Sequence, residues 1–191
     1  MSKIQKNIIV LVVAGLSLFT CAACGPGLMK PTQTIKAASA DKALITFVRA
    51  KSYGGGSEFI VWDSEEFVGV LVGGQYIQRE VAPGEHMFII HAQNWAYIKA
   101  NLEAGKKYYV VVNTSIGFTH AVAIPVPITK ETKYGQAEID QWMATLKPVT
   151  PNPEKSAAWV AKKTPEVQKA VENGNKPDAK FQILNPEDNW N

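Results

Sequence analysis

The sequence predicts a mainly β protein: an antiparallel β-sandwich of about seven strands, followed by a C-terminal α-helical extension. Short runs rich in β-branched and aromatic residues recur between residues 41 and 128, and such residues suit pleated strands. A turn with Gly, Pro or Asp separates almost every pair of runs. Beyond residue 128 the apolar spacing becomes helical. We therefore expect a β-sandwich domain over 41–128 and a helical extension and tail over 129–191.

Residues 1–23 are expected to be a lipoprotein signal peptide. Lys3 and Lys6 give it a basic start, and the apolar run over 8–20 is shorter than the roughly 20 residues that a membrane-spanning helix needs. Two alanines stand directly before Cys24, as in the bacterial lipobox, in which the cysteine is diacylated and becomes the new N-terminus. Cys24 is therefore the predicted lipidation site, where acyl chains such as palmitate would anchor the protein in a membrane.

Three other interpretations of this segment stay open. Cys21 is a weaker candidate for acylation, because Phe19 and Thr20 match the small residues of a lipobox poorly. An ordinary secreted protein and an uncleaved signal anchor are the other two. Gly25, rather than Asp, follows Cys24. By resemblance to the usual sorting pattern this favours the outer membrane of a bacterial cell envelope, on the side facing the periplasm.

Charge argues against a nucleic-acid partner. The chain has 20 Lys and Arg against 17 Asp and Glu, a net charge of +3. Lys3 and Lys6 would leave with the signal peptide, which lowers the net charge of the mature protein to about +1.

A tether is expected between the lipid and the folded body. Residues 25–40 are mostly small and polar residues and Pro, a composition that forms no packed core. Residues 24–40 are therefore predicted to be a flexible, lipid-anchored segment.

Seven segments are expected to be strands, and an eighth can be an edge strand at most, because it contains Pro125 and Pro127. The runs at 59–62 and 67–72 form a predicted hairpin. In order the seven segments are 43–49, 59–62, 67–72, 75–81, 86–92, 95–102 and 107–113, and the eighth is 121–128.

Two motifs at the centre of the β domain carry a resemblance. They are Pro83-Gly84-Glu85-His86 and Gly105-Lys106-Lys107-Tyr108-Tyr109, each a turn that leads into a strand. With the turns before them, they resemble a bacterial lipoprotein family known only as a domain of unknown function, itself similar to PEGA-like β-sandwich domains of envelope proteins. The resemblance covers roughly residues 41–118 and implies a fold. It implies no catalytic residues, because both motifs are turn-and-strand signatures.

The C-terminal part predicts helices. Ile139, Trp142, Met143 and Leu146 fall on one face of a helix over 134–146. A second helix is expected to begin at Pro153, with Asn152 as its N-cap.

Further start and stop signals follow. Thr164-Pro165 repeats the helix start signal, and Asn173-Gly174 is a stop. Phe181 to Leu184 is a short apolar run that is expected to dock on the body or to form another strand.

The sequence contains no catalytic or metal-binding pattern, and no cofactor is expected. His86 and His91 lie five apart in one predicted strand, so alternation places them on opposite faces. With His120 they match no zinc-ligand spacing, and no Gly-x-Ser-x-Gly elbow is present. The acidic pairs Glu65-Glu66 and Glu187-Asp188 lie in turn or tail sequence, where a solvated surface is expected rather than a glycosidase pair.

Trp95 and Tyr97 are the candidate ligand- or partner-binding residues. They share one face of a segment that Asn94 and Asn101 flank. Aromatic rings beside amides suit stacking on sugars or anchoring a partner protein. The competing interpretation is that these aromatic residues belong to the sandwich core.

These observations favour a membrane-anchored envelope lipoprotein that acts as a non-enzymatic binding or assembly module for another envelope protein. The alternative is a carbohydrate- or peptidoglycan-binding module that uses the same aromatic residues on cell-wall glycan. A hydrolase is the third hypothesis, which a deep pocket joining His120 to an acid would favour.

Overall fold

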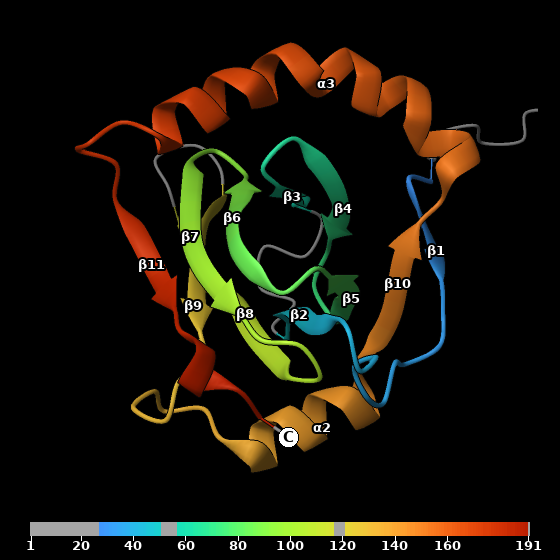
Figure 1. Ribbon diagram of the computed structural model, residues 1–191. Coiled ribbons are helices and arrows are strands. Elements are labelled where there is room, and N and C mark those ends of the chain that lie inside the picture. Colours follow the sequence, from blue (N-terminus) through green and yellow to red (C-terminus); the bar gives the residue numbers. More distant parts are fainter. Residues whose placement is uncertain (1–26, 51–56, 117–120, 191) are drawn as a thin grey trace, which may run out of the picture.

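A computed structural model describes residues 27–50, 57–116 and 121–190. Within these ranges the chain forms eleven strands in two mixed sheets, two α-helices and a short 3-10 helix. Figure 1 shows the helices α3 and α2 on opposite sides of the strands. The elements are β1 (Met29–Pro31), β2 (Ala43–Arg49), β3 (Phe59–Asp63), β4 (Glu66–Leu71), β5 (Gln75–Val81), β6 (Gly84–His91), β7 (Trp95–Leu102), β8 (Lys107–Ile116), β9 (Ala121–Pro127), α2 (Gln136–Thr145), β10 (Lys147–Pro151), α3 (Pro153–Gly174), β11 (Phe181–Leu184) and η1 (Pro186–Asp188).

The larger sheet has the strand order β1-β10-β5-β2-β8-β9. Its centre is β2, which pairs antiparallel with β5 and parallel with β8. All seven residues of β2 are buried. A strand covered on both faces needs apolar residues on both, which explains its nearly continuous apolar run.

The smaller sheet has the order β11-β7-β6-β3-β4. The neighbouring strands β4, β3, β6 and β7 pair antiparallel. β11 joins parallel to β7, with Phe181 opposite Tyr97. The β3–β4 turn places Ser64 at a φ of 51°. Ser64 of this turn and Phe181 of β11 line a cleft at the end of α3.

The two sheets pack face to face around one buried core to which both contribute. Phe47 of β2 meets Phe88 of β6 edge to face, with ring centroids 5.2 Å apart. A separate apolar cluster covers the outer face of each sheet. Ile139 and Trp142 of α2 pack on the larger sheet, and Val167 and Ala170 of α3 pack on the smaller sheet. The layer order is therefore α2, larger sheet, smaller sheet, α3, a sandwich-like arrangement with a helix on each side (Figure 1).

The mainly β prediction is confirmed, but its details need correction. Seven antiparallel strands were expected, whereas the described residues form eleven, and three of the strand pairs are parallel. Two of the four additional strands, β1 and β10, lie in segments rich in Pro, where strands are not expected from sequence. β10 and β11, both in the segment expected to be a helical extension, pair with β5 and β7 respectively.

The segment expected to be a flexible tether also differs from the prediction from Gly27 onward. Leu28 is buried, and β1 pairs antiparallel with β10. The backbone of Ile35 exchanges two hydrogen bonds with the amide of Gln78, at 2.7 and 3.0 Å. These contacts hold residues 27–40 along the larger sheet, and the part of the predicted tether before Gly27 lies outside the described residues.

The helix α3 is continuous through Pro165, which corrects the expected new helix start at 164–165. The missing N–H of Pro165 leaves the carbonyl of Ala161 without its helical donor. Ala161 and Pro165 are both exposed, so water can bond that carbonyl, while the Thr164 hydroxyl donates to Val160 O at 3.1 Å. Neither helix of the described ranges is long and apolar enough to span a bilayer.

Two sheet edges are closed by side chains. At the β9 edge, Pro125 and Pro127 carry no N–H, and the amide of Asn94 bonds both the N–H and the C=O of Ala123, each at 2.9 Å. At the β4 edge, the N–H of Val70 donates to Met29 Sδ at 3.2 Å. Both devices occupy backbone groups that could otherwise pair with another chain.

Candidate functional site

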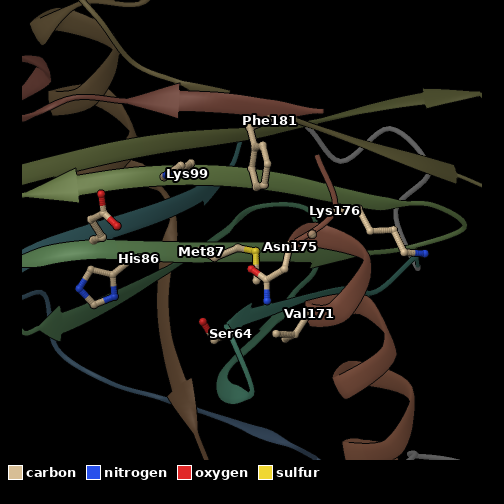
Figure 2. Close-up of a pocket in the computed structure, with 10 residues that line it drawn as sticks. Ser64, His86, Met87, Lys99, Val171, Asn175, Lys176 and Phe181 are labelled. Atoms are coloured by element: carbon tan, nitrogen blue, oxygen red, sulfur yellow. The ribbon is translucent and has the colours of Figure 1, made fainter. Parts of the chain in front are cut away.

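A cleft of about 440 Å³ opens at the C-terminal end of α3, and we call it the α3 cleft. Its volume lies within the range of roughly 300–1,000 Å³ that is usual for small-ligand sites. Five parts of the chain build it: the β3–β4 turn, β6, β7, the end of α3 and the start of β11 (Figure 2). Its lining residues are Ser64, Glu85, His86, Met87, Lys99, Val171, Gly174, Asn175, Lys176 and Phe181.

The floor of the α3 cleft is apolar. Met87 of β6, Phe181 at the start of β11 and Val171 of α3 supply it, and Figure 2 shows Met87 between the other two. Gly174 lets the end of α3 come this close, because an added Cβ would lie 2.6 Å from Met87 Sδ and 3.1 Å from the Tyr97 ring. The helix end is further fixed by the Tyr97 hydroxyl, which donates to Ala170 O at 3.1 Å.

The rim of the α3 cleft is charged and polar. The exposed ammonium groups of Lys99 and Lys176 flank Phe181 in the view of Figure 2. Glu85 adds a carboxylate and Asn175 an amide, and both residues are exposed. Exposed lysine side chains reorient readily. The rim can therefore meet an anionic group while the floor accepts an apolar one.

His86 lines the α3 cleft, and both of its ring nitrogens are engaged. Nδ1 lies 2.7 Å from Asp63 Oδ2, and Nε2 lies 2.8 Å from the carbonyl oxygen of Ala82. The Ala82 carbonyl oxygen is an acceptor and an ionised Asp63 carboxylate is another, so the site suits a ring that donates from both nitrogens. The hydrogen bond to Asp63 raises the pKa of His86, with the Ala82 carbonyl adding to the effect against the opposing burial. Because Asp63 and Ala82 engage both ring nitrogens, neither nitrogen is free to accept a proton from a ligand in the cleft.

Trp95 and Tyr97, the binding residues predicted from sequence, lie half-buried on the outer face of the smaller sheet, where α3 packs. The Trp95 ring stacks on His91 with centroids 3.8 Å apart and planes within 1°. His91 in turn lies 3.8 Å from Glu166 of α3, and burial lowers its pKa. The two aromatic residues thus support α3, and they lie beside the α3 cleft rather than in its lining.

The other residues that the sequence singled out are scattered. Glu65 accepts a hydrogen bond from Gln168 at 3.1 Å, and Glu66 pairs with Arg79, so this acidic pair serves two separate contacts. Cys21, Cys24 and His120 lie outside the described residues. Among the described residues, no three His, Cys, Asp or Glu side chains gather as metal ligands.

Arg49 is a buried cation that sequence reasoning did not identify. Its guanidinium donates to the carbonyl oxygens of Ser57 and Leu71 and lies 4.0 Å above the Phe59 ring, while Nε and Nη2 have no partner among the described residues. Burial lowers its pKa. The residue fastens the ends of β3 and β4 to β2, far in sequence from the α3 cleft.

Comparisons of the chain with family models, curated proteins and solved structures gave no match. Sequence reasoning missed the cleft because its residues come from the β3–β4 turn, β6, β7, β11 and the end of α3. The Asn173-Gly174 stop was its one visible signal.

Proposed function

We propose that this protein is a lipid-anchored lipoprotein of the bacterial cell envelope that binds another envelope protein through the α3 cleft. The N-terminal sequence and the resemblance of the two turn motifs support the envelope part of the proposal. The observation that carries the binding part is the composition of the cleft: an apolar floor beneath a rim with two lysines. The proposed contact is the α3 cleft instead of Trp95 and Tyr97, because α3 packs over both rings.

The lining also indicates what the partner should present. Met87, Val171 and Phe181 can take one apolar side chain, which gains free energy by leaving water. Lys99 and Lys176 can pair with a carboxylate nearby on the same segment. A peptide segment with an apolar side chain next to Asp, Glu or a C-terminal carboxylate fits both features. His86 cannot act on such a ligand as a base while Asp63 and Ala82 hold its nitrogens.

Charge reversal at the rim tests the binding proposal. Lys99→Glu and Lys176→Glu should each reduce capture of the partner from envelope extracts by about tenfold, the factor expected for about 1.4 kcal/mol of lost or reversed ion pairing. Lys162→Glu is the matched control, since Lys162 is exposed on α3 away from the cleft lining. Equal capture by all three variants would reject the α3 cleft as the contact. Sedimentation with purified cell-wall sacculi, sensitive to the same variants, would instead favour a glycan ligand.

Metabolic labelling with a fatty-acid analogue tests the anchor. The chain holds only two cysteines, Cys21 and Cys24. Cys24→Ala should abolish the label and release the protein from the membrane fraction. Cys21→Ala should keep the label and stay in the membrane fraction. Label that persists in Cys24→Ala and disappears in Cys21→Ala would move the anchor to Cys21, and label in neither the parent nor the variants would refute acylation.

A further inference from the structure

The N-terminal end of the described chain is fixed to the first turn of α3. The N–H of Asn152, the residue before α3, donates to Leu28 O at 2.8 Å. Leu28 is buried, and Met29 pairs with Pro151 at the end of β10. The start of β1, the end of β10 and the start of α3 thus form one corner of the molecule, which we call the β1 corner.

The β1 corner lies very close to the proposed lipid in covalent distance. Only three peptide links separate Cys24 from Gly27. Each link spans at most about 3.8 Å between Cα atoms, so Gly27 lies within about 11 Å of Cys24 whatever path the chain takes. The sequence predicted a flexible tether over residues 25–40, which would let the folded body move further from the lipid. Residues 27–40 are instead bound along the larger sheet.

The α3 cleft lies at the other end of the same helix. α3 has 22 residues. At a rise of 1.5 Å per residue such a helix is about 33 Å long, so roughly 30 Å separates the β1 corner from the cleft. Figure 1 shows α3 running from β10 and β1 at one side of the molecule to β11 at the other.

We infer that the β1 corner is the membrane-facing surface of the protein, with a lipid bilayer as its partner, and that the α3 cleft is held at the far end of α3 from that bilayer. This inference rests on the proposed acylation of Cys24. A chain of three links keeps the β1 corner at the headgroups, while the length of α3 carries the cleft outward to a partner in the aqueous space.

Two positions on α3 make a matched test of this orientation. Glu154 and Glu172 are both exposed, are the same residue type and lie on the same side of the helix, about 27 Å apart along its axis at 1.5 Å per residue. After acylation Cys24 has no free thiol, so Glu154→Cys and Glu172→Cys each carry a single fluorophore. The acylated variants would be placed on phosphatidylcholine vesicles whose headgroups carry a nitroxide quencher.

The inference predicts a large loss of fluorescence at position 154 and little loss at 172. Equal quenching at the two positions, or stronger quenching at 172, would overturn the orientation while leaving the anchor intact. Mass spectrometry of the purified protein tests the anchor separately: an unmodified Cys24 would overturn both the anchor and the orientation.

A flexible Gly/Ser insertion between Gly25 and Gly27 tests the role of the short chain. The insertion should remove the difference in quenching between positions 154 and 172, because the short chain alone creates that difference. An unchanged difference would also contradict the inference.

Discussion

Replacing Gly174 with Ala sets two effects of known size against each other. Ala stabilises a helix by up to about 1 kcal/mol relative to Gly, and less at a helix end. Against this, the new Cβ would lie 2.6 Å from Met87 Sδ and 3.1 and 3.2 Å from two Tyr97 ring carbons. Met87 is flexible and can move, but the Tyr97 ring is held by its bond to Ala170 O and by the ring of Phe181. Overpacking of this kind costs about 1–3 kcal/mol, so we expect a net destabilisation of about 1–2 kcal/mol.

Urea unfolding measures this difference directly, provided that the slope of the transition is the same in both proteins. Gly27→Ala is the control, because its Cβ would meet no atom of the described residues closer than 3.9 Å, and a change within about 0.5 kcal/mol is expected there. In a Met87→Ala background the cost of Gly174→Ala should fall, since one of the two clashes is gone. A Gly174→Ala variant as stable as the parent protein would refute the close approach of α3 to β6 and β7 on which the α3 cleft depends.

Three further perturbations test separate parts of the account. The pKa of His86 is higher in the folded protein than in the unfolded chain, so protonation of His86 stabilises the fold. This stabilisation is complete below about pH 6.5, the pKa of His in the unfolded chain, and is lost as the pH rises through the raised pKa of the folded protein. Asp63→Asn should flatten that part of the pH–stability curve measured by denaturant unfolding, and an unchanged curve would exclude the pair as its cause. Tyr97→Phe should cost about 1 kcal/mol through the lost bond to Ala170 O, and no cost would mean that this bond does not fix α3. Asn94→Ala should free the backbone of Ala123 and increase self-association in analytical ultracentrifugation, whereas a strictly monomeric variant would show that the amide does not guard this edge.

The sheets were predictable where a strand has a face to bury. The expected ranges 43–49, 75–81 and 95–102 coincide with β2, β5 and β7, because each presents enough apolar or alternating residues to show its period. Pro125 and Pro127 indicated an edge strand, and β9 is one. The strand β10 could not be found in this way. Val149 is its single buried residue, and the strand contains Pro148 and Pro151.

The site was harder to predict because its geometry comes from the packing of α3. Thr164-Pro165 has the sequence of a helix start, yet the exposed position of Pro165 lets the helix continue past it. Only a continuous helix brings Gly174 onto Met87 and Tyr97, and so forms the α3 cleft. The same packing places Trp95 and Tyr97 under the helix, which alternation along a strand cannot reveal.

In-cell photo-crosslinking tests the central claim, binding of an envelope partner at the α3 cleft, most directly. A photoreactive amino acid would replace Lys176 at the rim of the cleft or, as a control, Gln141 on the exposed side of α2 at the opposite face of the molecule. We predict that position 176 captures one dominant envelope protein, identified by mass spectrometry, and that position 141 does not. The same products from both positions, or no product at 176 in cells where the protein is acylated, would contradict the account.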